Sequence, residues 1–409
     1  MIRVHASWIL PIDVRPIRDG WVDLDAGRIV TVGERQASDV VKERDLGRVA
    51  VLPGLVNTHT HLELSYLHRQ IPPARTFVDW VRAVVAARRA RTDPSAIEMT
   101  DALQRGIDEA VRAGTALVGD ISNTLASFAP LARSSLAAVV FYELIRFRAR
   151  DAARLIAEAC RELDALIPTP SVRAGLAAHA PYSVAPELFQ AIRRAVDRDP
   201  DVPWSVHLAE SCEESEFIRS ASGPWRAFLE DVRAWDDTWE PAGVSPVEYL
   251  DKSGLLDGRV LAVHGVHAGS SDLALLRARG STLVTCPRSN AHTGAGIPPL
   301  AAFYASGVRV AVGTDSLAST DSLSVFDELA CMRILAPSVP ARTLLDSATR
   351  QGASALGFGS ELGSITPGKR ACLIAVEIPD QTADVEEYLV SGIHPEQIQW
   401  VDGPGCEIS

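Results

Sequence analysis

Short apolar runs alternate with longer amphipathic stretches from residue 51 to residue 361 of the chain. The apolar runs have the length of buried strands, and the longer stretches carry apolar residues at the three- and four-residue spacing of a helix. The predicted strands are Thr115–Gly119, Ala138–Glu143, Val172–His179, Pro203–His207, Arg259–His264, Thr282–Cys286 and Val308–Thr314. The predicted helices are Ala74–Arg91, Ile97–Ala113, Ala152–Leu166, Pro186–Val196, Ser270–Arg279, Leu300–Ser306 and Leu323–Leu335.

An eighth strand is predicted where the apolar run that begins at Leu52 leads into His59 and His61. Eight strand and helix units over about 300 residues favour an α/β fold, a closed TIM-type (β/α)8 barrel with functional residues at the carboxyl ends of its strands. A doubly wound parallel sheet is the alternative, but no Gly-x-Gly-x-x-Gly pattern follows an early strand. The sequence therefore predicts a barrel.

The two ends of the chain read as short strands separated by turns. The predicted strands are Ile2–Ala6, Trp21–Leu24, Arg28–Val32, Gly363–Ile365 and Ala371–Val376. Each end is too short to enclose a core alone, so we expect the two ends to pair. We therefore predict two domains: a small β-sandwich formed by residues 1–52 and 362–409, and a (β/α)8 barrel formed by residues 53–361.

The alternation is interrupted between the fifth and sixth predicted strands. The segment Glu213–Ser245 carries Trp225, Trp235 and Trp239 and fits neither pattern. Such an excursion either covers the mouth of the barrel or packs as an ordinary aromatic segment, and the sequence leaves both interpretations open.

The composition is typical of a globular protein, with 47% hydrophobic and 22% charged residues. A formal net charge of -12 disfavours nucleic acid and anionic membrane as partners, because both repel a surplus of carboxylates. A small-molecule substrate fits this charge better. No basic and apolar leader opens the chain, and no apolar run approaches the roughly 20 residues of a membrane span. We expect a cytoplasmic protein.

The cysteines are scattered and form no Cys-x-x-Cys pair. They are Cys160, Cys212, Cys286, Cys331, Cys372 and Cys406. This distribution indicates reduced thiols rather than a disulfide framework or a zinc ribbon, which agrees with a cytoplasmic location.

Polar side chains follow four of the predicted strands. They are His59 with His61, His207 with Glu210, His264, and Asp315. One buried histidine is usually a hydrogen-bonded core residue, but four such clusters at one end of a barrel indicate a common site. Three imidazoles and one carboxylate suit a borderline divalent ion, zinc first and iron or manganese as substitutes. Because a metal with an open position makes water a nucleophile at neutral pH, we expect hydrolysis.

The segments that carry these residues resemble the amidohydrolase superfamily. They are Pro53–His61, His207–Glu210, His264–His267, Cys286–Asn290 and Gly313–Ser316. They resemble most its deaminase and chlorohydrolase branch, and within it the aminodeoxyfutalosine deaminases of menaquinone biosynthesis. The resemblance covers nearly the whole chain and implies a metal-dependent aminohydrolase, an enzyme that acts on carbon–nitrogen bonds other than peptide bonds and releases ammonia from a purine-type heterocycle. The alternatives are adenosylhomocysteine, guanine or cytosine deaminases, cyclic amide hydrolases and chlorohydrolases.

The same resemblance implies roles for individual residues. The four implied metal ligands are His59, His61, His207 and Asp315. Glu210 would carry a proton from water to the leaving nitrogen, His264 would orient the water or the oxyanion, and Asp315 would take the first proton. Relatives with two metals bridge them with a lysine at the end of the fourth strand, but no lysine lies between His61 and His207. We therefore expect a single ion.

The substrate contacts that we expect lie around this centre. They are His179, Arg288, Glu63 and Ser316. His179 closes the fourth strand, where this branch places a histidine against the substrate. Arg288 would face a carboxylate such as the benzoate of aminodeoxyfutalosine. Glu63 could equally cap the next helix, and Asn290 could fix its own loop. A homodimer is considered because the family commonly forms dimers.

Overall fold

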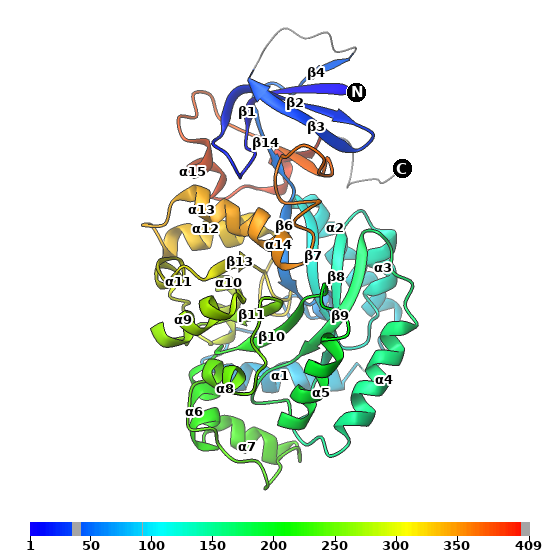
Figure 1. Cartoon of the computed structure of the whole chain (residues 1–409), viewed down its shortest axis with the longest axis vertical. Coiled ribbons are helices and arrows are strands. Elements are labelled where there is room, and N and C mark those ends of the chain that lie inside the picture. Colours follow the sequence, from blue (N-terminus) through cyan, green and yellow to red (C-terminus); the bar gives the residue numbers. More distant parts are fainter. Residues whose placement is uncertain (35–41, 92, 402–409) are drawn as a thin grey trace.

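The computed structural model describes residues 1–34, 42–91 and 93–401, and it contains a barrel with a smaller sheet at one end (Figure 1). The barrel sheet has eight strands that follow one another in space in the order of the sequence, each pair parallel. They are β6 (Leu55–Thr60), β7 (Thr115–Ser122), β8 (Ala137–Leu144), β9 (Val172–Ala178), β10 (Trp204–Leu208), β11 (Val260–His264), β12 (Thr282–Thr285) and β13 (Arg309–Val312).

The first and last strands of this sheet meet at the seam of the barrel. Thr60 and Asp315 form a parallel bridge, and the backbone N–H groups of Thr314 and Asp315 donate to the His59 carbonyl at 3.1 and 3.0 Å. Gly313 makes this approach feasible, because a Cβ atom there would lie 2.7 Å from the same carbonyl oxygen. The nearly closed parallel barrel confirms the predicted fold class.

Helices surround the barrel, and each predicted helix is present with shifts of up to three residues at its ends. Several of them begin at a side-chain cap, as where Thr76 accepts the Asp79 N–H and Ser324 accepts the Asp327 N–H. The helices are α1 (Phe77–Arg89), α2 (Ile97–Arg112), α3 (Phe128–Arg133), α4 (Ala152–Asp164), α5 (Pro186–Val196), α6 (Cys212–Ser220), α7 (Pro224–Asp231), α8 (Pro246–Lys252), α9 (Ser270–Arg279), α10 (Pro287–Thr293), α11 (Leu300–Ser306), α12 (Val325–Leu335), α13 (Ala341–Asp346), α14 (Gly352–Ala355) and α15 (Val385–Leu389).

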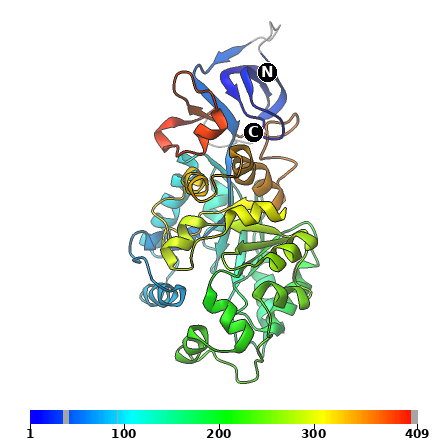
Figure 2. The same ribbon diagram turned by 90° about the vertical axis from the view of Figure 1, so that its left-hand side faces the viewer.

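The smaller sheet joins the two ends of the chain, as the views in Figures 1 and 2 show. Its strands are β1 (Ile2–Ile9), β2 (Ile17–Asp25), β3 (Arg28–Glu34), β4 (Glu43–Asp45), β5 (Val49–Pro53), β14 (Leu373–Glu377) and β15 (Ile398–Trp400). β14 lies antiparallel to β5, with Leu373 opposite Pro53. The expected pairing of the two ends is therefore present as one mixed sheet. The boundaries of the two domains stay a prediction.

One predicted strand is wrong. Residues Gly363–Ile365 form a bend, since Gly363 adopts a φ of +86° and the Ile365 N–H donates to the Pro11 carbonyl rather than to a neighbouring strand. A left-handed φ at Gly363 is incompatible with extended pairing.

The excursion between β10 and β11 forms α6, α7 and a loop at the carboxyl end of the barrel. β5 leads from the smaller sheet into β6, so all barrel strands run away from that sheet, and the excursion lies at the far end with α1 (Figure 1). Its aromatic side chains pack against one another and against their neighbours: Phe217 stacks on Trp239 at 4.8 Å, and Trp225 stacks on Tyr182 at 3.8 Å between ring centroids. The tryptophans therefore build an aromatic core at the mouth of the barrel.

The cysteines partly contradict the prediction. Cys160, Cys212, Cys286 and Cys331 are free, but Cys372 is disulfide-bonded. The spacing of cysteines along a sequence does not reveal which of them come within bonding distance in the fold. Because one cysteine is disulfide-bonded, the cysteines no longer support a cytoplasmic location. The predicted free thiol Cys406 lies outside the described residues.

Within the described part of the chain, we find no helix that is both long and apolar enough to traverse a lipid bilayer.

Candidate metal centre

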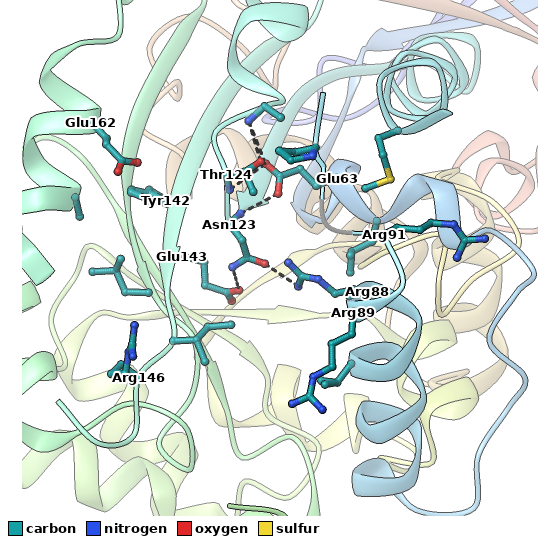
Figure 3. Close-up of a pocket in the computed structure, with 18 of the residues that line it drawn as sticks. Glu63, Arg88, Arg89, Arg91, Asn123, Thr124, Tyr142, Glu143, Arg146 and Glu162 are labelled. Carbon is teal, nitrogen blue, oxygen red and sulfur yellow. Dashed lines mark hydrogen bonds between the residues drawn. The ribbon is translucent and has the colours of Figure 1, made fainter. Parts of the chain in front are cut away.

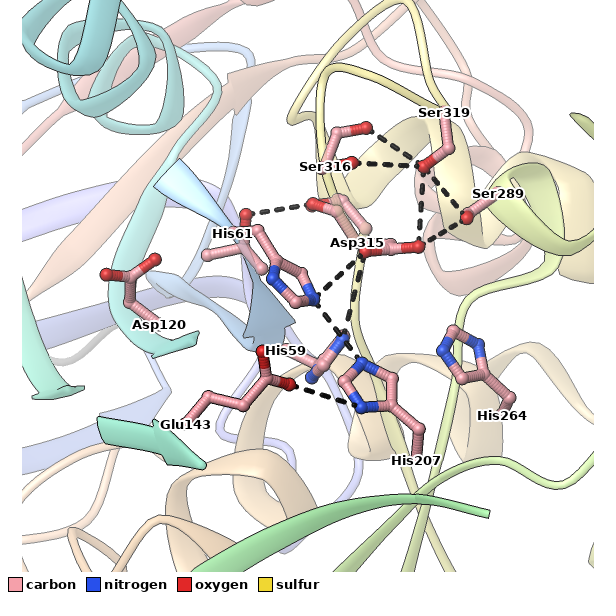
Figure 4. Close-up of polar contacts among 12 residues, drawn as sticks. His59, His61, Asp120, Glu143, His207, His264, Ser289, Asp315, Ser316 and Ser319 are labelled. Atoms are coloured by element: carbon pink, nitrogen blue, oxygen red, sulfur yellow. Dashed lines mark hydrogen bonds and ion pairs between the residues drawn. The ribbon is translucent and has the colours of Figure 1, made fainter. Parts of the chain in front are cut away.

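The four side chains expected as metal ligands converge at the carboxyl end of the barrel (Figure 4). His59 lies near the end of β6, His61 directly follows that strand, and His207 lies in β10. Asp315 follows β13 and forms the bridge to β6 at the seam. His61 Nε2 lies 3.4 Å from Asp315 Oδ1 and 3.4 Å from His207 Nε2, and His59 Nε2 lies 3.9 Å from Asp315 Oδ1. The seam and strand ends therefore bring together residues that are up to 256 positions apart in the sequence.

These four residues fit a bound divalent ion. Two ligands at about 2.1 Å from a tetrahedral zinc ion lie about 3.4 Å apart, close to the separations found here. His59 is fully buried, and neither of its ring nitrogens has a hydrogen-bond partner within the described residues. Burial is the main cause that lowers the pKa of His61 and of His207 to about 4, which keeps both imidazoles in the neutral form that binds metal.

The orientation of His207 is fixed by its neighbours. Its Nδ1 lies 2.8 Å from the His179 carbonyl oxygen, so Nδ1 carries the hydrogen and Nε2 is left to face His61. A carboxylate oxygen of Glu143 lies 3.6 Å from the same Nδ1. The carbonyl of His179 thus orients a metal ligand, while its imidazole bonds to Ser183.

Asp315 is held by two serines that the sequence did not single out. Asp315 adopts a left-handed φ of +60°, and its Oδ2 accepts hydrogen bonds from Ser289 at 2.6 Å and Ser319 at 3.3 Å. The other oxygen, Oδ1, faces His61. One carboxylate therefore has one oxygen directed to the metal centre and one held by hydroxyl groups.

Glu210 and His264 form a buried pair beside the ligands. Asn290 Nδ2 lies 2.9 Å from His264 Nδ1, so the amide donates to Nδ1 and Nε2 carries the hydrogen. That Nε2 lies 3.4 Å from Glu210 Oε1. Burial raises the pKa of Glu210 well above its ordinary value, and the nearby carboxylates of Asp315 and Glu214 add to this effect. A carboxyl group with a high proton affinity at this place suits a proton carrier.

Glu214 supports the backbone on which Glu210 stands. The Glu214 carboxylate accepts the N–H groups of Ala209 at 3.0 Å and of Glu210 at 2.8 Å, while Ala209 is held at a left-handed φ of +51°. Glu214 is fully buried, and burial raises its pKa to about 8. Glu214 falls at the start of the predicted excursion and carries no functional signal in the sequence.

Replacing Glu214 by glutamine is expected to lower kcat by about 10- to 100-fold without loss of metal. The amide presents one acceptor instead of two, so one backbone N–H beside Glu210 loses its partner, and we expect a stability loss of about 1–3 kcal/mol. Steady-state kinetics, metal analysis and thermal unfolding measure the three effects. Glu216→Gln is the matched control, because Glu216 is exposed on the same helix. An unchanged kcat in Glu214→Gln contradicts this role.

The expected substrate contacts have different surroundings. Glu63 accepts hydrogen bonds from Asn123 N–H, Thr124 Oγ1 and Ala126 N–H, which fastens the loop after β7. Ser316 is buried and bonds to Ser319. The guanidinium of Arg288 is surrounded by carboxylates: it pairs with Asp321, and its Nη1 lies 3.7 Å from Asp327 and 3.6 Å from Glu328. Their part in substrate binding stays a prediction.

A cavity of about 650 Å³ opens beside the centre, and it brings the predicted contact Glu63 together with residues that carry no sequence signal (Figure 3). Its wall includes Glu63, Arg88, Asn123, Glu143 and Arg146. Glu143 joins the cavity to the metal centre, because it lies both in this wall and beside His207. A volume of this size is typical of a small-molecule site.

Comparison with known proteins agrees with this geometry. The family model described as "Amidohydrolase family" matches residues 50–393. The chain is 32% identical over 357 residues to the aminodeoxyfutalosine deaminase of Deinococcus radiodurans, covering 81% of both chains. It is 30% identical over 380 residues to the 5-methylthioadenosine/S-adenosylhomocysteine deaminase of Syntrophobacter fumaroxidans, covering 89% of this chain and 81% of that protein. Among solved structures, it is similar to an adenosine deaminase of Xanthomonas campestris with bound zinc, with a TM-score of 0.83, 27% identity, and 97% and 90% of the two chains covered.

Proposed function

The chain belongs to the amidohydrolase family, and from this premise we propose that it is a metal-dependent deaminase of a purine-type nucleoside. One observation carries the proposal: the Glu210 carboxyl group lies 3.4 Å from His264 Nε2, immediately beside a cluster of three histidines and Asp315. A hydrolase that releases ammonia needs a proton carrier at this place, because ammonia is a poor leaving group until its nitrogen is protonated.

One divalent ion, with zinc as the first choice, would be held by His59, His61, His207 and Asp315. The ion would supply a Lewis acid that lowers the pKa of water toward about 7. The zinc in the similar adenosine deaminase of Xanthomonas campestris supports this choice. The end of β9 carries His179 where a lysine would be needed to bridge a second metal, so we propose a single ion.

The side chains around the ion divide the proton transfers. Asp315 takes the first proton from water while Ser289 and Ser319 keep its Oδ2 in place. The water oxygen adds to the ring carbon. The Nε2–H group of His264 orients this oxygen, and the hydrogen bond from Asn290 to Nδ1 fixes the direction of the imidazole. Glu210 delivers its proton to the departing nitrogen, the carbon–nitrogen bond breaks, and ammonia leaves while the carbon keeps the water oxygen. Asp315 then releases its proton to solvent and Glu210 takes one up, which restores both groups.

Aminodeoxyfutalosine is the substrate that we place first, which would assign the enzyme to menaquinone biosynthesis. The relative from Deinococcus radiodurans supports this choice. The second candidate is 5′-methylthioadenosine or S-adenosylhomocysteine, which the relative from Syntrophobacter fumaroxidans favours. All three share the adenine ring on which the chemistry takes place and differ in the group attached to the ribose.

A panel of substrates is expected to separate these candidates. We expect kcat/KM for aminodeoxyfutalosine to exceed that for 5′-methylthioadenosine, S-adenosylhomocysteine and adenosine by about 100-fold, a discrimination of about 2.7 kcal/mol between their transition states. A coupled assay for ammonia with zinc-loaded protein measures each rate. Comparable rates for the four nucleosides would reject aminodeoxyfutalosine as the preferred substrate, and no ammonia from any of them would reject the deaminase.

A further inference from the structure

We propose that the cavity beside the metal centre binds a carboxylate group of the substrate, with the guanidinium of Arg88 as its principal contact and Arg89 and Arg146 as supporting charges. This inference deepens the proposed function and rests on it for the reaction that follows binding.

The three arginines stand on two sides of one cavity. Arg88 and Arg89 close the carboxyl end of α1, and Arg146 follows β8 on the opposite wall, as Figure 3 shows. Glu143 lies between them at the end of β8, next to the metal ligand His207. A molecule whose reacting ring lies at the metal centre can therefore extend its far end between these arginines.

Within the described residues, these three arginines have no carboxylate partner. Within residues 1–34, 42–91 and 93–401, no carboxylate lies within 4.0 Å of the guanidinium groups of Arg88, Arg89 or Arg146, whereas Arg82 on the same helix pairs with Asp231 at 2.7 Å. The protein as a whole has 52 acidic and 40 basic residues. A guanidinium without a carboxylate partner in a cavity wall is available to an anionic ligand.

The cavity wall also holds four acidic side chains, Glu63, Glu143, Glu158 and Glu162, of which the first three have identified partners. Glu63 accepts four hydrogen bonds from the loop after β7, with a fifth from Ser122. Glu143 accepts from Asn123 at 2.7 Å, and Glu158 pairs with Arg154 at 2.8 Å. None of these carboxylates forms an ion pair with Arg88 within the described residues, so its guanidinium is available to a ligand.

Arg88 is positioned for directional binding. Its Nη1 donates to Asn123 Oδ1 at 2.9 Å, and Asn123 in turn donates to Glu143. This chain of hydrogen bonds fixes the guanidinium plane and leaves its remaining N–H groups for a ligand, and a planar guanidinium binds a carboxylate through two parallel hydrogen bonds.

The surroundings of Arg288 support the same assignment. Asp321, Asp327 and Glu328 already surround its guanidinium, so it has little positive charge to offer a further carboxylate. We therefore transfer the carboxylate contact expected from the sequence from Arg288 to Arg88.

Binding of small probes tests this site without the reaction. Zinc-loaded protein is titrated calorimetrically with benzoate, benzamide and inorganic phosphate, in the wild type, Arg88→Gln and the control Arg82→Gln. We expect benzoate to bind at least about tenfold more tightly than benzamide, and Arg88→Gln to weaken benzoate by about 30-fold, because a charge-assisted bidentate contact is lost. Arg82→Gln is expected to leave benzoate binding unchanged, since Arg82 is outside the cavity wall.

Turnover provides the second readout. The kcat/KM of aminodeoxyfutalosine is compared with that of its neutral methyl ester, and Arg88→Gln is expected to reduce the ratio of acid to ester by about 30-fold through KM. Benzoate binding that is insensitive to Arg88→Gln, or phosphate binding tighter than benzoate, overturns the carboxylate site. If benzoate binding depends on Arg88 but no ammonia is released, the proposed function is rejected and the carboxylate site stands. If ammonia is released but Arg88→Gln leaves the acid-to-ester ratio unchanged, the carboxylate site is rejected and the proposed function stands.

Discussion

Replacing Glu210 by glutamine is expected to lower kcat by about 10³-fold while the protein keeps its metal. Glu210 is 2% exposed and lies beside His264, so its amide analogue preserves the shape of the site but can neither accept nor deliver the proton that the leaving nitrogen needs. Three residues separate it from Glu214, whose carboxylate continues to hold the backbone in the variant.

Single-turnover measurement of ammonia release in wild type and Glu210→Gln tests this expectation. Metal analysis serves as the control, because equal metal content shows that the site is intact. If Glu210→Gln retains a rate within about tenfold of the wild type, another group carries the proton and the assignment of Glu210 is wrong.

The second large effect is expected from His59. His59→Ala removes a fully buried imidazole whose two nitrogens have no other partner in the described structure, so we expect loss of the metal and with it the activity. Removing a residue that only hydrogen-bonds to a metal ligand lowers metal affinity by about 10- to 100-fold. We expect the loss of a ligand itself to lower metal affinity by more than this. Metal content after dialysis, followed by rates with added zinc, measures the change.

His267→Ala is the matched control for His59→Ala. The imidazole of His267 lies at the same end of the barrel but bonds to the Ala295 carbonyl at 2.8 Å, away from the ligand cluster. We expect this variant to retain its metal. A stoichiometric metal in His59→Ala, or its loss in His267→Ala as well, would contradict the assigned ligand set.

The barrel and its metal ligands were predictable because both follow from periodic features of the sequence. Parallel strands of a barrel end on one face, so polar residues that follow four apolar runs must converge there. His59, His207 and Asp315 meet for this reason, although the sequence separates them widely.

The walls of the cavity were not predictable in the same way. Arg88 lies in the last turn of a helix rich in arginine, and Asn123 follows a strand as many loop residues do. The role of each side chain depends on its partners in the folded protein. Arg88 bonds to the neutral amide of Asn123, whereas Arg288 lies beside the carboxylate of Glu328. Sequence spacing carries no information on such pairing.

The sequence left the role of the excursion open and did not predict the disulfide, for a related reason. The three tryptophans of the excursion carry no periodicity, so only the structure shows that Trp225 stacks on Tyr182 from the loop after β9. Cys372 belongs to no recognisable cysteine pattern, yet it is disulfide-bonded. Both contacts depend on chain proximity that arises only after folding.

Zinc titration of metal-free protein tests the central claim most directly. Aminodeoxyfutalosine, 5′-methylthioadenosine, S-adenosylhomocysteine and adenosine are supplied in turn, and ammonia is measured against the deaminated nucleoside. We predict one ammonia for each nucleoside converted, no reaction without metal, and a rate that stops rising at one zinc per chain. No ammonia from any of these nucleosides at any zinc ratio, or a rate that rises until two zinc ions are bound, would contradict a deaminase with a single metal.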